Sequence, residues 1–505
     1  MASTVDVTTD SGIVRGQRGK RALRWRAVPY AAPPVGELRL RAPQPVQPWT
    51  GIRDATAFAF AAIQHRGGTW LAPRKYQPMS EDALTLNIAA PAVESGKRRP
   101  VMVFIHGGGY LFGTSALGLY SGSGLAAQGD VVVVSLNYRL NAFGYVDFSE
   151  FSTPERPFES NLGLRDQVAA LEWVRRNISA FGGDPDNVTI FGESAGANAV
   201  ITLLATPAAN GLFHRAIAES PPADWALTRA DAAEFARRSL AALGTEPADA
   251  ASALASADAH ELRRAVSSSV RQVMRERPGL VPVCPVIDGD FLPQAPLAAI
   301  AAGDGAAVPL IVGTNRNEGT LFSKYADQLP TNERRLELLF EQAGAGVRDR
   351  ITFAYPSYPE PAVAVRAGGD YVFWRPAIQT LEGHSRHAPA FAYRYDFAPR
   401  ALRLNGLGAT HASELFAVFG AANTMLGRAL TSLGDRRDLL AVTKQMQEHW
   451  LSFARTGHPL VSWPQYSEQR RSTMVFDRHP RVLTDPDRDR RIAWQGIGVP
   501  SLLAG

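Results

Sequence analysis

Apolar residues in this chain occur in short runs, separated by segments whose apolar positions follow helical spacing. The runs at residues 101–105, 131–138 and 188–191 are rich in β-branched residues, and each predicts a short buried strand. Residues 163–178 have apolar side chains three or four positions apart, which predicts a helix with one buried face. Residues 195–204 are mostly small or apolar and predict a buried helix. This alternation is typical of a mainly parallel sheet covered by helices.

The pattern continues toward both ends of the chain. Residues 1–60 predict short strands and turns, and further strands are predicted at 309–312 and 391–395. The composition shifts at about residues 228–278, where Ala, Arg and Ser predict helices inserted over the sheet as a candidate pocket lid. No internal repeat or low-complexity linker marks a second domain, so we expect one domain over residues 1–505.

The composition is that of an ordinary globular protein, with 45% hydrophobic and 20% charged residues. The net charge of +5 is a small excess over 505 residues, and the basic residues are mostly scattered arginines. There is no basic helix and no basic patch interleaved with aromatic residues. We therefore expect no nucleic-acid partner.

Cysteine usage and apolar run length bear on the compartment. Cys284 is the only cysteine, so intrachain disulfides are impossible and a reducing compartment is favoured. We expect Cys284 to be a small buried hydrophobic residue and not a nucleophile. The first ten residues lack the basic and apolar regions of a signal peptide, and no apolar run reaches the roughly 18 residues of a membrane span. These features predict a cytoplasmic protein.

A G-x-S-x-G sequence, Gly192 to Gly196, lies between the predicted strand at 188–191 and the helix at 195–204. This spacing is typical of the nucleophile elbow of α/β-hydrolases. A strand that turns at once into a helix strains the backbone of its central residue, and flanking glycines let the two elements pass closely. On these five residues alone, a helix N-cap is an equally good interpretation of Ser194.

A glycine-rich segment, His106 to Tyr110, directly follows the predicted strand at 101–105. A phosphate-binding loop is the first alternative, but neither a Gly-Lys-Ser/Thr sequence nor a complete dinucleotide-binding pattern is present. The better interpretation is a loop whose bare backbone amides bind an oxyanion.

Three residues occur in the order of a serine hydrolase triad. A serine nucleophile needs a histidine base and a carboxylate that orients it, and α/β-hydrolases order them Ser, Asp or Glu, His. Ser194, Glu318 and His411 follow this order, and the last two each come in a loop after a predicted strand. Taken singly, Glu318 could be a surface carboxylate, and His411 is one of ten histidines that could form a structural pair with Glu414. A metal site is not expected, because no H-E-x-x-H or clustered Cys/His spacing occurs.

Ten short motifs surround these positions in a fixed order along nearly the whole chain. They are PYAAPPVGELR at 29–39, EDALTLNI at 81–88, HGGG at 106–109, NYRL at 137–140, NLGLRDQ at 161–167, FGGDP at 181–185, FGESAG at 191–196, PVIDGDF at 285–291, GTNRNEG at 313–319 and GATHASE at 408–414. In this order they resemble the type-B carboxylesterase family, which includes bacterial para-nitrobenzyl esterases, animal carboxylesterases and cholinesterases.

The resemblance implies an α/β-hydrolase fold: a mixed, mostly parallel sheet with helices on both faces and inserted helical lid segments. It also implies that Ser194 is the nucleophile, Glu318 the acidic triad member and His411 the base. The backbone amides of three residues would form the oxyanion hole. They are Gly108, Gly109 and Ala195.

The resemblance further places four apolar residues near the wall of the substrate pocket, although such residues could equally belong to the core. They are Tyr110, Phe112, Leu321 and Phe322. The family's usual Ser-Gly is replaced here by Ser220-Pro221-Pro222, and the next tryptophan, Trp225, comes early. In relatives this stretch helps to shape the acyl pocket. No acyl preference therefore carries over. Ala62 and Ala83 stand where many secreted members have a disulfide, which fits an intracellular protein.

The sequence thus predicts a bacterial serine carboxylesterase that hydrolyses uncharged, moderately hydrophobic esters through an acyl-enzyme. We expect no cofactor, no metal, a small-molecule ester as partner, and a monomer or weak homo-oligomer. One alternative is a specialised hydrolase of carbamates, polyester fragments or acylated natural products. Another is a non-catalytic binding protein, like adhesion members that have lost the triad; the presence of all three residues favours an enzyme.

Overall fold

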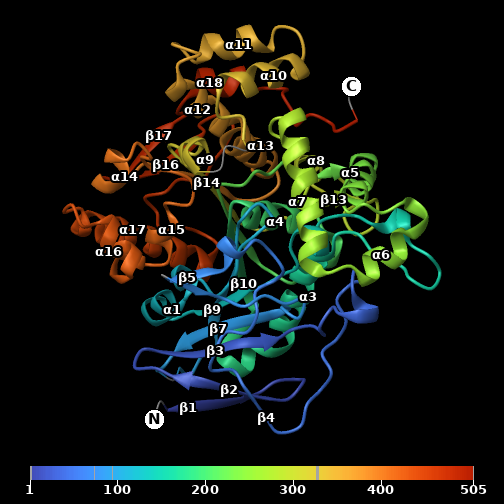
Figure 1. Ribbon diagram of the computed structural model, residues 1–505. Coiled ribbons are helices and arrows are strands. Elements are labelled where there is room, and N and C mark those ends of the chain that lie inside the picture. Colours follow the sequence, from blue (N-terminus) through green and yellow to red (C-terminus); the bar gives the residue numbers. More distant parts are fainter. Residues whose placement is uncertain (1–2, 73, 94, 326–328, 504–505) are drawn as a thin grey trace.

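The computed structural model describes residues 3–72, 74–93, 95–325 and 329–503 (Figure 1). Its large sheet contains β1 (Thr4–Thr8), β2 (Ile13–Arg18), β3 (Ala22–Pro29), β4 (Ile52–Asp54), β7 (Thr85–Pro91), β8 (Arg99–Ile105), β9 (Val132–Leu136), β10 (Gly183–Glu193), β11 (Arg215–Glu219), β14 (Leu310–Asn315), β15 (Ala390–Tyr395), β16 (Ser472–Phe476) and β17 (Arg481–Thr484). Two small sheets pair β5 (Trp70–Ala72) with β6 (Lys75–Tyr76) and β12 (Leu227–Thr228) with β13 (Val286–Ile287).

The described helices surround this sheet. They are α1 (Ser123–Gly129), α2 (Asn141–Gly144), α3 (Leu162–Asn177), α4 (Ala195–Leu204), α5 (Arg229–Ala242), α6 (Ala250–Ser256), α7 (Ala259–Glu276), α8 (Pro296–Ala302), α9 (Gly319–Tyr325), α10 (Glu333–Ala343), α11 (Val347–Ala354), α12 (Pro361–Gly369), α13 (Arg375–His384), α14 (Arg400–Leu404), α15 (Leu415–Val418), α16 (Met425–Leu430), α17 (Arg436–Thr456) and α18 (Arg488–Ala493). A π-helical turn, Asp370–Trp374, joins α12 to α13.

The sheet is mixed and mostly parallel, as predicted. Its order is β1-β2-β3-β7-β9-β8-β10-β11-β14-β15-β16-β17, with β4 beside β2. Neighbours from β9 to β16 run parallel, whereas the pairs from β1 to β9 and the β16–β17 pair run antiparallel. The strands predicted at 101–105, 131–138 and 188–191 are β8, β9 and β10.

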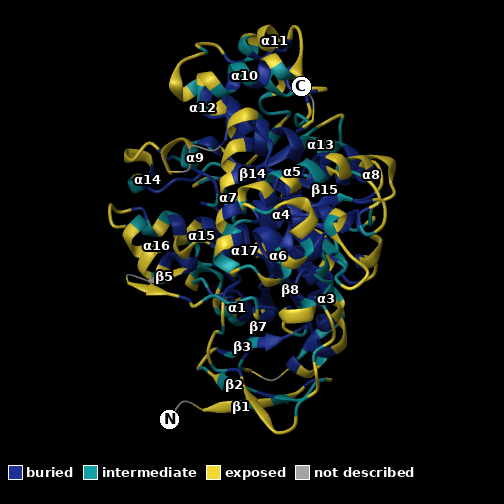
Figure 2. Cartoon of the chain, turned by 45° about the vertical axis from the view of Figure 1, so that its right-hand side comes forward, coloured by how far each residue is buried: buried dark blue, intermediate teal, exposed yellow. Residues whose placement is uncertain are grey.

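The sheet separates the core into two layers, because successive side chains of a strand point to opposite faces. On β8, Val101, Val103 and Ile105 pack on the face covered by α3, α4 and α13, while Met102 and Phe104 pack on the face covered by α1, α15 and α17. Figure 2 shows buried residues through the middle of the molecule and exposed residues on the outer helices. Burial of both faces explains why the central strands read as continuous apolar runs.

The segment at 228–278 contains α5, α6 and α7, and α5 packs against α7. Phe235 and Leu240 on α5, and Leu262, Val266 and Val270 on α7, are buried in the main core. Apolar spacing along these helices therefore has a direct packing role. That the segment is a lid within a single large domain stays a prediction.

None of the helices in the described ranges is both long enough and apolar enough to cross a membrane.

The register of the parallel strands brings four strand ends to one edge of the sheet. Gly192 of β10 lies opposite Ile105 of β8, Glu193 lies opposite Glu219 of β11, and Glu219 lies opposite Gly313 of β14. The segments that follow these strands must therefore converge at this edge, where ligands of open parallel sheets bind.

Candidate active site

Ser194 occupies the sharp turn between β10 and α4, with φ 59° and ψ −125°. This is the strained conformation that the sequence predicts for an elbow. A Cβ atom at Gly196 would lie 2.1 Å from the carbonyl oxygen of Ile105, and one at Gly192 would lie 2.5 Å from the carbonyl oxygen of Gly196. The G-x-S-x-G spacing is thus required because a side chain at either glycine would overlap the backbone.

Glu318 and His411 form a buried pair beside this elbow. Nδ1 of His411 lies 2.6 Å from Oε2 of Glu318. The two loops that bear them are joined, because the Asn317 amide donates to the Ala409 carbonyl over 2.9 Å. A carboxylate in this position selects the imidazole tautomer whose Nε2 is free to accept a proton.

The second oxygen of Glu318 is fixed by two donors that the sequence analysis missed. Oε1 accepts a hydrogen bond of 2.6 Å from the Ser220 hydroxyl and another of 2.6 Å from the Asn315 amide. Ser220 follows the last residue of β11, and Asn315 ends β14. The Asn315 contact is local, three residues from Glu318, whereas the Ser220 contact required knowledge of the strand order.

His411 and Ser194 lie at the same edge, but no hydrogen bond of the described residues joins them. Nε2 of His411 instead lies 3.0 Å from Oε1 of Glu193, without hydrogen-bond geometry. Glu193 immediately precedes Ser194, so the imidazole is next to the elbow. In the absence of substrate, contacts between catalytic groups are often incomplete.

The charge around His411 favours its protonated form. Burial lowers the pKa of this imidazole, but the carboxylates of Glu193 and Glu318 outweigh burial and raise the pKa above its usual value. The neighbouring carboxylates therefore stabilise positive charge on this imidazole.

Two further buried carboxyl groups, Glu414 and Glu219, lie behind this pair. Oε2 of Glu414 accepts a 2.6 Å hydrogen bond from the Asn315 side chain, and Oε1 of Glu219 accepts one of 2.9 Å from Trp450. Burial, with the charges of Glu193 and Glu318, raises the pKa of Glu414 to about 8. Burial and the neighbouring Glu414 raise the pKa of Glu219 well above its usual range.

The raised pKa of Glu414 makes a prediction about stability and pH. The folded protein keeps this proton up to about pH 8, whereas an unfolded chain releases it near pH 4.3. Between these values the folded state binds more protons, so rising pH removes stability at about 1.4 kcal/mol per pH unit. Glutamine does not titrate, so Glu414→Gln should lose none of this stability. The difference in free energy of unfolding between Glu414→Gln and the wild type should therefore move in favour of the variant from pH 5 to pH 8.

Urea unfolding at pH 5, 6, 7 and 8 measures the gain. Glu172→Gln, at an exposed position on α3, is the matched control and should follow the wild type. Parallel curves for Glu414→Gln and the wild type would contradict the prediction.

The glycine loop after β8 leaves its amides open. Among the described residues, no acceptor pairs with the backbone amides of Gly108, Gly109 or Ala195. Gly108 has φ +116°, and a Cβ there would lie 1.9 Å from the carbonyl oxygen of Phe112, so only glycine fits. Three unpaired amides beside Ser194 are suited to stabilise an oxyanion.

Two side chains outside the predicted set hold the glycine loop in place. The hydroxyl of Tyr138 donates to the His106 carbonyl over 2.6 Å. The buried amide of Gln64 accepts from the Gly113 amide at 2.8 Å and donates to the Gly113 carbonyl at 2.7 Å. Both ends of the loop are therefore positioned before substrate arrives, which is what preorganised stabilisation requires.

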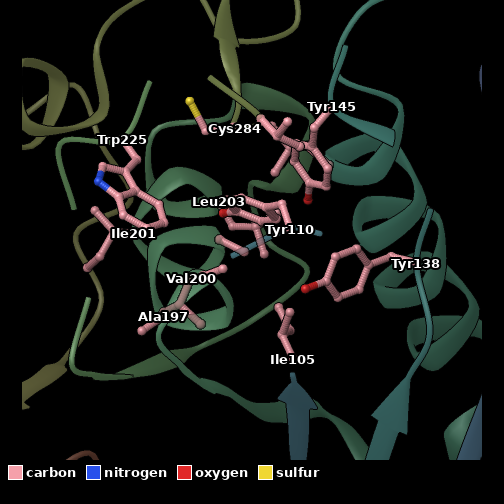
Figure 3. Packing of buried hydrophobic residues seen from close by; sticks show 14 of the residues in the cluster. Ile105, Tyr110, Tyr138, Tyr145, Ala197, Val200, Ile201, Leu203, Trp225 and Cys284 are labelled. Atoms are coloured by element: carbon pink, nitrogen blue, oxygen red, sulfur yellow. The ribbon is translucent and has the colours of Figure 1, made fainter. Parts of the chain in front are cut away.

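Tyr110 belongs to the core. Its side chain is fully buried, its hydroxyl donates to Asn198 over 2.5 Å, and its ring centroid lies 4.0 Å from that of Tyr145. Figure 3 shows it beside the buried side chains of α4. The structure thus supports the core interpretation of Tyr110 that the sequence left open.

The other predicted pocket residues differ in exposure. Phe112 is half exposed, Leu321 is partly buried, and Trp225 is buried, with its carbonyl accepting from the Asn198 side chain. The ring of Phe322 lies 5.0 Å from the imidazole of His411. Only Phe322 of this set contacts a predicted triad member through its ring, and pocket lining stays a prediction for Phe112, Leu321 and Trp225.

Phe373 is an additional aromatic residue at the site. Its ring centroid lies 4.3 Å from that of His411 and 5.5 Å from that of Phe322. It is in the π-helical turn between α12 and α13, a type of distortion that is common at functional sites. No sequence signal marks it, because a buried phenylalanine in a helical segment reads as ordinary core.

Comparisons with known proteins match nearly the whole chain. The model of a family described as "Carboxylesterase family" matches residues 3–494. The para-nitrobenzyl esterase of Bacillus subtilis (strain 168) is 39% identical, covering 96% of this chain and 97% of that protein. A medium-chain fatty acyl-CoA hydrolase precursor of Anas platyrhynchos is 35% identical (93% and 88%), and a phenmedipham hydrolase of Pseudarthrobacter oxydans is 31% identical (93% and 94%).

Solved structures of related proteins superpose on nearly the whole chain. A PNB esterase superposes with a TM-score of 0.85 at 37% identity, covering 97% of this chain and 100% of that one. A carboxylesterase of Geobacillus stearothermophilus superposes with a TM-score of 0.85 at 35% identity, with the same coverage.

Proposed function

This chain belongs to the carboxylesterase family and is a serine carboxylic ester hydrolase with an α/β-hydrolase fold, and we propose that Ser194, Glu318 and His411 form its catalytic triad. One observation supports this assignment above the others. The 2.6 Å contact of Glu318 with His411 lies at the sheet edge where Ser194 has the elbow conformation. These groups are far apart in sequence, and a purely structural role would not need them to meet beside three open amides.

The proposed reaction has two halves. The Ser194 hydroxyl attacks the acyl carbon while His411 takes its proton, and the oxyanion binds the amides of Gly108, Gly109 and Ala195. His411 then donates this proton to the leaving alkoxide, and the ester C–O bond breaks to release the alcohol. Water attacks the acyl-enzyme with His411 as base, and the products are a carboxylic acid and the free serine.

Glu193 has a supporting role in this scheme. Its carboxylate is near Nε2 and raises the pKa of His411, so it stabilises the imidazolium that forms as Ser194 loses its proton. The same contact delays the first proton transfer, because the imidazole has to leave Glu193. We propose that substrate binding shifts this balance toward Ser194.

We propose uncharged, moderately hydrophobic esters of small or aromatic alcohols as substrates. The rings of Phe322 and Phe373 beside His411 support an apolar binding site. The name of the Bacillus subtilis relative also makes para-nitrobenzyl esters the first compounds to assay. Carbamates, polyester fragments and acylated natural products are the alternatives, and a panel that varies acyl and alcohol parts separately distinguishes them.

We also propose that this protein is a cytoplasmic monomer or weak homo-oligomer, with no nucleic-acid partner and no cofactor.

Cys284 is buried, and burial raises the pKa of its thiol, so it is an inert core residue.

Covalent labelling tests the proposed function. A fluorophosphonate should form one phosphorus–oxygen bond to Ser194 with loss of fluoride, and hydrolysis should stop in proportion to the label incorporated. Mass spectrometry of peptides locates the label. Labelling of a different serine, or full hydrolysis after complete labelling of Ser194, would overturn the proposal.

A further inference from the structure

A cavity of about 790 Å³ is lined by residues of α9, α10 and α12. Figure 1 shows α9 and α12 beneath α10 and α11, which form one end of the molecule. The described walls of the cavity come from residues 316–320, from 331–334 and from α12, and include neither Ser194 nor His411. Glu318 of the proposed triad is one of these wall residues, so the cavity borders the proposed hydrolytic centre at that residue. A volume of about 300 to 1,000 Å³ is typical of small-molecule binding sites.

The cavity adjoins a smaller, polar one of about 100 Å³, since Arg316, Arg366 and Asp370 line both. The smaller cavity is surrounded by four guanidinium groups and two carboxylates. They are Arg316, Arg366, Arg394 and Arg490, with Asp370 and Asp487. Guanidinium groups thus outnumber carboxylates around the smaller cavity, whereas the walls of the larger one have equal numbers of the two.

Most of these charged groups already have partners. Arg490 donates to Asp370 over 2.5 Å, and Arg394 donates to Asp487 over 2.8 Å. Within the described part of the chain, Arg366 has no ion pair and no side-chain hydrogen bond, although its charge helps to lower the pKa of Asp487. Its exposed guanidinium is available to an incoming anion.

One side of the larger cavity is apolar, and its other walls include polar and charged residues. Pro359, Pro361, Ala362 and Val365 lie along it, and Val365 directly precedes the unpaired Arg366 on α12. Apolar surface next to a free guanidinium matches a molecule with one anionic head and an apolar body. Arginine binds planar carboxylates through two parallel hydrogen bonds.

We propose that the double cavity is a binding site for an amphiphilic carboxylate, an alkyl or aryl carboxylic acid. Its carboxylate binds Arg366, with Arg316 nearby, and its apolar body lies along α12. The acids released by ester hydrolysis belong to this chemical class. The proposed site borders the hydrolytic centre at Glu318 but contains neither Ser194 nor His411, and one of its tests rests on the proposed role of Ser194 as the nucleophile.

Isothermal titration calorimetry with 4-phenylbutanoate tests the site. We expect binding to the wild type, about tenfold weaker binding to Arg366→Gln, and weaker binding to Arg316→Gln, because a charge-assisted hydrogen bond is lost. Arg437→Gln, at an exposed position on α17, is the matched control and should bind like the wild type. The neutral 4-phenylbutanamide should bind the wild type about as weakly as the acid binds Arg366→Gln.

Two further measurements distinguish this site from the hydrolytic pocket and from a simple phosphate site. Binding should persist after Ser194 is blocked by a fluorophosphonate, and inorganic phosphate should bind more weakly than the amphiphilic acid. Absence of binding, equal binding to Arg366→Gln, or phosphate binding as tight as that of the acid would each overturn the proposal. So would binding that disappears when Ser194 is blocked, since the acid would then occupy the hydrolytic pocket.

Discussion

Replacement of Ser194 by alanine should lower kcat/KM for a chromogenic short-chain ester by about 10⁴- to 10⁶-fold. The alanine side chain has no oxygen to attack the acyl carbon, so only the oxyanion loop and substrate binding remain. The fold should be unchanged, because among the described residues nothing hydrogen-bonds the Ser194 hydroxyl and the elbow is fixed by backbone packing. Activity against a para-nitrophenyl ester, with circular dichroism as the fold check, measures the effect.

Ser268→Ala is the matched control for this variant. Ser268 is an exposed serine on α7, and its replacement should leave kcat/KM unchanged. Turnover within tenfold of the wild type by a folded Ser194→Ala protein would rule out the acyl-enzyme mechanism.

Replacement of Glu318 by glutamine should lower kcat by about 10⁴-fold with little change in KM. The carboxylate uses Oε2 for His411 and Oε1 for two donors, Ser220 and Asn315. A glutamine has one acceptor oxygen and an NH₂ group, so it cannot accept hydrogen bonds both from His411 and from the pair Ser220 and Asn315. If its oxygen stays with Ser220 and Asn315, its NH₂ group faces Nδ1 of His411 and selects the tautomer whose Nε2 cannot act as a base.

Steady-state kinetics of the folded variant gives kcat and KM separately. Glu172→Gln, at an exposed position on α3, is the matched control and should behave as the wild type. A full kcat for Glu318→Gln would show that the 2.6 Å contact with His411 is structural and not catalytic. A rise in KM alone would assign Glu318 to substrate binding.

The resting arrangement of His411 bears on both results. Its Nε2 lies against Glu193, and burial lowers its pKa while the carboxylates of Glu193 and Glu318 raise it. When Glu318 is replaced, Glu193 remains as the carboxylate beside His411, and the contact between Nε2 of His411 and Glu193 becomes stronger. We therefore expect Glu318→Gln to lower kcat while the imidazole of His411 stays at the site.

Local sequence was sufficient for the elements nearest the reaction. The apolar runs of β8, β9 and β10 and the helical spacing of α3 and α4 identify themselves because hydrophobic periodicity is a property of neighbouring residues. The elbow was readable for the same reason, since the G-x-S-x-G spacing is local, although the room needed at Gly196 also depends on Ile105 of the neighbouring strand β8. Three candidate triad residues could also be named, because each is part of a short motif.

Contacts between distant segments could not be read in this way. The hydrogen bond from Ser220 to Glu318 depends on β11 lying beside β14, and the ring of Phe373 reaches His411 from a π-helical turn. Tyr110 follows the glycine loop, yet close packing with Tyr145 puts it in the core.

The difference between local patterns and contacts of distant segments also explains the two least expected features of the molecule. Glu193 belongs to the elbow motif, but its contact with His411 depends on how a loop more than two hundred residues away is folded. The cavity beside Arg366 forms where α9, α12 and α18 pack imperfectly around unequal numbers of charges. Periodicity and motif spacing describe neighbours along the chain, whereas strand register, side-chain packing and burial set which distant groups meet and how strongly their charges interact.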